Sequence, residues 1–224
     1  MKIDFRNPAV SAVIAAVLLL VLGPGYWMYR ESGKEDQRKA VAAHVAQATQ
    51  WLNLSGSLRG AEGEAAELEK LVAAADKPIA ALRDFPSKYE PAVFDAAEAY
   101  IVDIQRALRR QGALVRVREV TAASQNALIQ HMGRADNRSD DWIREAVDLR
   151  KRLEKDFFEF RAGAAAYSSA LEALPASRRK LAEVLPASRL YDEAAVGKVQ
   201  TRAAEDAKAA AEELENLKKL PPPR

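Results

Sequence analysis

The sequence predicts an all-α protein: a single N-terminal transmembrane helix followed by an elongated antiparallel helical bundle with long, coiled-coil-like helices. Three observations lead to this prediction. Apolar residues recur at spacings of three and four along most of the chain, and no window shows the period of two that is typical of strands. One dense apolar run occupies residues 9–22. Segments rich in proline and glycine divide the remainder into a few long helical stretches.

The N-terminal segment has the features of a membrane anchor. A basic tail at residues 1–7 precedes a helix expected at residues 8–29. At ~1.5 Å per residue this helix would measure roughly 33 Å, enough to cross a hydrocarbon core of ~30 Å. The aromatic cluster YWMY and Arg30 follow the apolar run, as aromatic and basic residues do at the end of a membrane span. We therefore expect a signal-anchor that holds the protein in the lipid bilayer through residues 8–29.

A cleaved signal peptide is the alternative interpretation of this segment. The apolar run has the length of a signal-peptide core, and cleavage would follow Gly25. Glycine is a weak substitute for the small residues that signal peptidase prefers, which favours the anchor. Because a short basic head before an apolar run is how export signals begin, the C-terminal domain is expected outside the cytoplasm. This predicts a single-pass protein of a bacterial inner membrane with its domain in the periplasm.

The rest of the chain is expected to form one extracytoplasmic helical domain at residues 30–220, with a proline-rich tail at 221–224. Within it, Ser139 is a candidate N-cap for the fourth long helix of the domain, and two copies of LPASR, starting at Leu174 and Leu185, are expected to flank a short helix. The expected helices cover residues 35–54, 58–75, 91–132, 140–174 and 192–217, with a short helical turn and a loop in the proline-containing segment between the second and third.

The helix after Ser139 has the most regular apolar pattern of the chain. Its 3-4 spacing is typical of bundle packing and predicts a core position for each member of the stripe. The stripe comprises Ile143, Ala146, Leu153, Phe157, Phe160, Ala164, Tyr167, Leu171 and Leu174. Phe158 falls outside the stripe, and Phe158 and Trp142 are candidates for an aromatic interface if they cluster on the surface.

Composition argues against several classes of function. The 34 basic and 32 acidic side chains nearly balance, so no global field favours nucleic acid as a partner. The absence of cysteine excludes disulfides, thiolate metal sites and cysteine nucleophiles. The two histidines, His44 and His131, lie on different expected helices. We therefore assign no catalytic, cofactor-binding or metal-binding residue, and do not expect an enzyme.

A basic segment on the third long helix of the domain is the candidate contact site. It contains Arg106, Arg109, Arg110, Arg116 and Arg118 and no carboxylate between Asp103 and Glu119. Arginine makes planar, bidentate contacts to phosphate and carboxylate, so these side chains could bind lipid headgroups or an acidic partner.

Pairing within the chain is the alternative for part of this segment. A tight turn near Arg83 would bring the glutamates of residues 62–67 within reach of Arg106, Arg109 or Arg110. This geometry leaves Arg116 and Arg118 unpaired, as the stronger candidates for an external contact.

Two functions remain compatible with these features. The favoured one is a membrane-tethered helical scaffold or accessory subunit of a cell-envelope protein complex, which contacts another envelope protein through its helices. The alternative is a sensor-like envelope binding module that takes a small or lipidic ligand in its bundle or on its basic surface. Homo-oligomerisation is compatible with both.

Overall fold

The computed structural model describes residues 8–58, 63–86, 88–134, 139–186 and 193–219, and all regular secondary structure in these ranges is helical. The all-α prediction is therefore confirmed. The helices are α1 (Pro8–Ser57), α2 (Glu64–Ala74), α3 (Asp76–Arg83), α4 (Pro91–Gly133), α5 (Asp140–Glu172), α6 (Leu174–Val184) and α7 (Glu193–Lys219).

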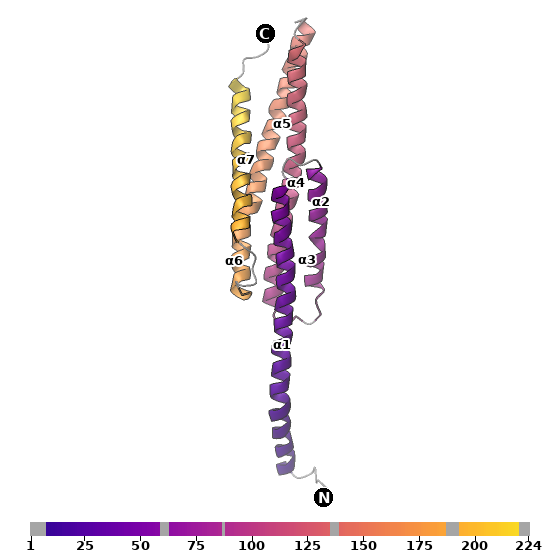
Figure 1. The fold of residues 1–224 in the computed structure, drawn as a ribbon, viewed down its shortest axis with the longest axis vertical. Coiled ribbons are helices and arrows are strands. Elements are labelled where there is room, and N and C mark those ends of the chain that lie inside the picture. Colours follow the sequence, from indigo (N-terminus) through magenta and orange to yellow (C-terminus); the bar gives the residue numbers. More distant parts are fainter. Residues whose placement is uncertain (1–7, 59–62, 87, 135–138, 187–192, 220–224) are drawn as a thin grey trace.

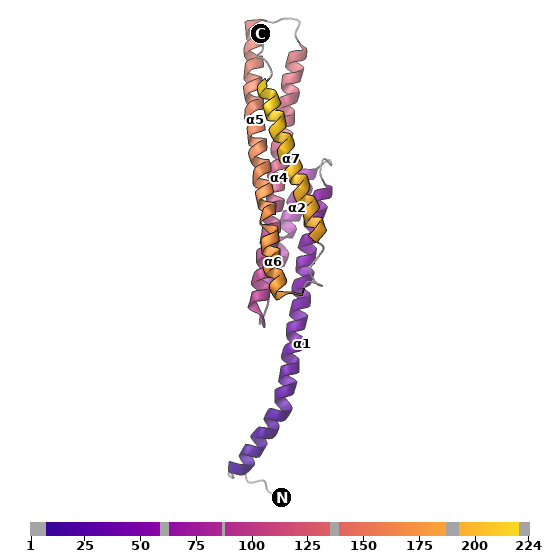
Figure 2. The same ribbon diagram turned by 90° about the vertical axis from the view of Figure 1, so that its left-hand side faces the viewer.

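Helix α4 is the central element of an elongated bundle. It contacts α1, α2, α3, α5 and α6, and α7 packs against α5 and α1. Helix α1 enters at one end of the molecule, and its N-terminal part extends well beyond the other helices (Figure 1). At the opposite end, the hairpin of α4 and α5 extends past α1 and α2 (Figure 2). The molecule is thus a rod, with the start of α1 and the tip of the α4–α5 hairpin at its two ends.

The expected break between the first two helices is wrong, because α1 is one continuous helix of 50 residues. Gly33 lies inside it, and a Cβ atom built there would lie 2.6 Å from Cε2 of Tyr89. The missing side chain lets the loop before α4 approach α1, where the Tyr89 backbone N–H donates to the side-chain oxygen of Gln37 at 3.0 Å. This packing maintains a helix through residues of low intrinsic helix propensity.

In the part of the chain that the structure describes, no helix is long and apolar enough to cross a membrane. For residues 8–28, only the backbone of α1 belongs to that part, and their side chains do not. The tails at residues 1–7 and 221–224 lie outside the described residues. The anchor at residues 8–29 therefore stays a prediction.

Local signals explain where most of the other helices begin. Helix α2 starts at Glu64 rather than at residue 58, after Gly63, which adopts a left-handed φ of 76°. The helical turn expected before α4 is α3, which spans 8 residues. Ser139 caps α5 as predicted, since its hydroxyl accepts a hydrogen bond from the Trp142 backbone N–H at 3.3 Å. The second LPASR copy extends from Leu185 into residues outside the described part.

The apolar core lies in two clusters. The larger one joins α4 to its neighbours, and the smaller one joins α5 to α7 around Leu153, Phe157 and Leu214. Phe160 is half-buried and packs against both clusters. The stripe members Leu153, Phe157, Tyr167 and Leu171 are all buried, so this part of the core prediction is confirmed. The largest fully buried side chains on α4 are Tyr100, Phe94, Ile101, Ile104 and Leu108.

Candidate functional site

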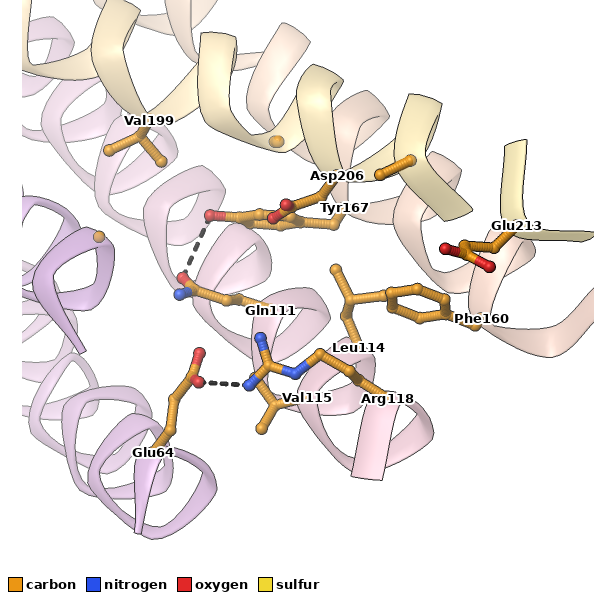
Figure 3. A pocket seen from close by; sticks show the side chains of 13 residues that line it. Glu64, Gln111, Leu114, Val115, Arg118, Phe160, Tyr167, Val199, Asp206 and Glu213 are labelled. Carbon is orange, nitrogen blue, oxygen red and sulfur yellow. Dashed lines mark hydrogen bonds and ion pairs between the residues drawn. The ribbon is translucent and has the colours of Figure 1, made fainter. Parts of the chain in front are cut away.

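A cavity of about 230 Å³ lies where α1, α2, α4, α5 and α7 meet (Figure 3). Most of its wall is apolar, and a few charged or amide side chains converge on it, which is the usual composition of a small-molecule site. The apolar and aromatic lining includes Leu114, Val115, Phe160, Tyr167, Val199 and Ala203. The polar lining consists of Glu64, Gln111, Arg118, Asp206 and Glu213.

Helix α7 leaves room for this cavity because it presents small side chains to it. Ala203 and Ala209 line the cavity, where a leucine would fill the space. Asp206 and Glu213 are separated by two helical turns, so both project from the same face of α7 towards the cavity (Figure 3). One wall of the cavity is therefore a helix face that combines alanines with two carboxylates.

Gln111 forms a polar connection between three helices beside the cavity. Its side-chain N–H donates to the carbonyl oxygen of Ser55 on α1 at 2.9 Å. Its side-chain oxygen accepts a hydrogen bond from the Tyr167 hydroxyl on α5 at 3.1 Å (Figure 3). Both side chains are buried, so these hydrogen bonds offset the cost of removing their polar groups from water.

The Glu64–Arg118 ion pair forms a second polar connection, between α2 and α4. The Arg118 guanidinium donates to the Glu64 carboxylate at 2.5 Å. Only 3% of Glu64 is exposed, whereas Arg118 reaches solvent with part of its side chain. A buried carboxylate is tolerated when a cation of this kind compensates it.

The predicted register between the glutamates and the arginines is therefore wrong. Arg116 and Arg118, expected to be unpaired, form ion pairs with Glu69 and Glu64 on α2. The reason is the position of the turn: α3 continues to Arg83, and the loop before α4 follows it, so α2 lies opposite a later part of α4.

Two of the three earlier arginines, Arg106 and Arg109, have partners other than those expected. Arg106 pairs with Asp103 one turn earlier on α4 at 2.6 Å, and Arg109 lies 4.0 Å from Asp76 on α3. Arg110 is exposed, and no ion pair of its side chain occurs among the described residues. Glu62 lies outside the described residues. The five arginines thus do not form one uncompensated basic surface.

The predicted aromatic interface does not form as a single patch. Trp142 stacks on His131 with ring centroids 4.9 Å apart, and its indole N–H donates to the His131 carbonyl oxygen at 3.3 Å. Phe158 is 65% exposed, but it lies sixteen positions further along α5, or about 24 Å along the helix axis. Trp51 packs against the main core. Phe158 is therefore an exposed aromatic residue without Trp142 or Trp51 beside it.

Sequence reasoning missed the cavity, although part of the signal was present. Glu64, considered from the sequence only as a partner for the arginines, precedes the core residue Leu68 by one helical turn. Asp206 likewise follows the buried Ala203 at a helical spacing. A carboxylate at a core spacing indicates either a buried ion pair or a polar cavity, and only the packing of five helices distinguishes the two.

No cluster of three or more acidic or histidine side chains suited to a metal ion occurs within the described ranges. The cavity has the chemistry of a binding site, with an apolar body, two aromatic rings and carboxylates at one wall. Comparison with known proteins adds no relative, since no family model, no curated protein and no solved structure matches the chain.

Proposed function

We propose that the protein is a membrane-tethered helical scaffold or accessory subunit of a cell-envelope protein complex. In this proposal residues 8–29 anchor it in the inner membrane, and the bundle lies in the periplasm. The observation that carries the proposal is the rod-like shape, in which one helix leads from the proposed anchor directly into the bundle (Figures 1 and 2).

The continuity of α1 matters because a helix transmits orientation, whereas a flexible linker does not. A domain joined to its anchor in this way would hold the α4–α5 hairpin at a defined distance from the bilayer. Helix α4 alone has 43 residues, which corresponds to about 65 Å. Such a rod is suited to positioning a partner away from the membrane surface.

The hairpin also offers apolar side chains to a partner. Val120, Ile129 and Met132 on α4 and Phe158 on α5 are exposed. Exposed apolar residues on long helices are typical of surfaces that receive a partner helix, with coiled-coil-like packing. We propose that another envelope protein contacts this hairpin.

A single pair of variants tests the proposal. Ile129 is 60% exposed, and the adjacent Gln130 is also exposed, so either position accepts a new carboxylate without disturbing the core. Full-length protein carrying Ile129→Glu should recover at least about tenfold less partner in a mild-detergent pull-down read by mass spectrometry, because a charge would oppose apolar contact. Gln130→Glu is the matched control and should recover the partner normally. Equal recovery by both variants would argue against the hairpin surface.

A binding module is the second candidate function, and the cavity favours it. Its apolar wall and convergent polar groups are the features expected of a ligand site. The two functions use different parts of the molecule and are tested separately.

A further inference from the structure

We propose that the cavity beneath α7 binds a small uncharged molecule with an aromatic or aliphatic body and one hydroxyl or amide group. This inference rests on the second candidate function, the binding module, and is independent of the scaffold. It names the class of ligand that the charges, the polar contacts and the volume of the cavity favour together.

The charged side chains of the lining are compensated or face solvent. Arg118 pairs with Glu64 at 2.5 Å, so these two side chains together contribute no net charge to the cavity. Asp206 is half-buried and has an interaction partner of its own. Glu213 is exposed, so water and salt screen its carboxylate. A charged ligand would therefore leave water without gaining an ionic partner among these side chains, which disfavours cations and anions alike.

The remainder of the lining is mostly apolar and suits the body of an uncharged ligand. Leu114, Val115 and Val199 supply aliphatic surface, and the rings of Phe160 and Tyr167 line the α5 side (Figure 3). Removing the apolar surface of a ligand from water is favourable roughly in proportion to its area. An aromatic ligand would in addition pack edge-to-face or offset against these rings.

Gln111 supplies an uncharged polar contact at the cavity. A side-chain amide has two N–H donors and an oxygen that can accept two hydrogen bonds. Among the described contacts, one N–H of Gln111 donates to the Ser55 carbonyl oxygen, and the oxygen accepts one hydrogen bond from the Tyr167 hydroxyl. A second N–H and a second acceptor position are left, and a ligand hydroxyl or amide likewise donates and accepts. Gln111 is thus suited to the polar group of an uncharged ligand.

Volume limits the size of the ligand. An apolar cavity of ~150 Å³ can hold benzene, and sites for drug-sized molecules begin near ~300 Å³. The cavity of about 230 Å³ lies between these values. A phenyl ring with a short chain that ends in a hydroxyl fits this range, whereas a lipid acyl chain with its headgroup does not. The ligand is therefore small rather than lipidic.

The test compares three probes that share one aromatic body. Full-length protein in mild detergent is titrated calorimetrically near neutral pH with 2-phenylethanol, phenethylamine and 3-phenylpropionate, each corrected by a protein-free detergent blank. Under these conditions the amine is a cation and the propionate is an anion. We expect 2-phenylethanol to bind at least about tenfold more tightly than either charged probe, because a charge in the cavity would lose its hydration without ionic compensation.

One pair of variants on α7 locates the binding. Ala209 lines the cavity and is exposed, so the ring of Ala209→Phe can enter the mouth of the cavity without displacing a core residue. This variant should weaken 2-phenylethanol by at least about tenfold, while its thermal midpoint stays near that of the wild type. Ala204→Phe is the matched control, because Ala204 is exposed on the same helix and does not line the cavity. It should bind 2-phenylethanol as the wild type does.

The possible outcomes distinguish this inference from the functions proposed above. Equal or tighter binding of a charged probe would overturn the uncharged class and leave the binding module standing. Binding of 2-phenylethanol that survives Ala209→Phe would place the site elsewhere and overturn the assignment. No binding of any probe at millimolar concentration would contradict the binding module and this inference with it. The Ile129→Glu pull-down reports on the hairpin alone and tests the scaffold separately.

Discussion

At the scale of single residues, the buried Tyr100 is expected to make the stability of the fold depend on pH. Burial raises the pKa of Tyr100 above its ordinary value of 10.0, and the hydrogen bond with Thr49 opposes this shift only in part. Only 2% of the side chain is exposed, so an ionised phenolate would have to form inside the core. The neutral hydroxyl lies 3.3 Å from the Thr49 hydroxyl.

This raised pKa predicts a stability loss at alkaline pH. The favourable contribution of the neutral phenol is complete below the ordinary pKa of 10.0 and is lost as pH rises through the raised pKa of the folded state. The free energy of unfolding of the wild type should therefore fall more steeply above about pH 10 than that of Tyr100→Phe. Urea unfolding from pH 8 to pH 12 measures both slopes. Parallel curves over that range would contradict the prediction.

The two arginines that pair with α2 provide a second residue-scale prediction. Arg118→Met leaves the buried Glu64 carboxylate without its guanidinium and should cost ~2 to 4 kcal/mol of unfolding free energy. Arg116→Met removes an exposed partner of Glu69 and should cost at most ~1 kcal/mol. Chemical denaturation of both variants at neutral pH gives the comparison. Similar costs would show that Glu64 is compensated by another group.

At the scale of helices, adjacent phenylalanines on α5 differ in environment. Phe157 is 6% exposed and packs with Leu153 and Leu214, whereas Phe158 projects into solvent. Phe157→Ala should therefore cost ~3 to 5 kcal/mol through lost burial and a residual cavity. Phe158→Ala removes the same atoms from an exposed position and should change the free energy of unfolding by less than ~0.5 kcal/mol. A cost below ~1 kcal/mol for Phe157→Ala would place this stripe on a surface.

Helix boundaries were predictable where a signal lies within a few residues of the boundary. Pro91 and Ser139 place the starts of α4 and α5, because the missing N–H of proline and the capping hydroxyl of serine act locally. The continuity of α1 between residues 29 and 35 was not predicted, since the packing at Gly33 involves Tyr89, which is distant in sequence. Packing against a residue far away in the sequence therefore determines the conformation of this segment, which local helix propensity alone does not predict.

The candidate site was less predictable than the helices for a similar reason. The balance of charge around Glu64 depends on which turn of α4 lies opposite α2, and that register follows from the length of α3 and its loop. The cavity itself depends on the distance between α7 and the other helices that line it, namely α1, α2, α4 and α5. Periodicity identifies which residues face inward, but it does not determine where facing side chains leave a space.

At the scale of the whole molecule, the two proposals occupy separate regions of the rod. The exposed apolar residues proposed to contact a partner, Val120, Ile129, Met132 and Phe158, lie on the α4–α5 hairpin, and the cavity lies where α1, α2 and α7 meet this hairpin. Ligand binding beneath α7 would add contacts between α7 and the hairpin without covering Ile129. A partner and a ligand could therefore be bound at the same time.

Residues 1–29 contain the proposed anchor and are expected to account for membrane attachment. Deleting residues 1–29 should release the protein from the membrane fraction, because the apolar run and its aromatic flank are removed together. The bundle should stay folded, since Val41, Val45 and Leu52, through which α1 contributes to the core, all lie after this segment.

Fractionation with carbonate washing measures membrane attachment, and far-UV circular dichroism with a thermal melt checks the fold of the shortened chain. A mature protein that is already soluble and begins at Tyr26 would instead indicate cleavage. In spheroplasts, external protease should digest the bundle of the full-length protein, because a short basic head followed by a long domain favours translocation of that domain. A protected bundle would contradict the proposed periplasmic location and, with it, the envelope partner.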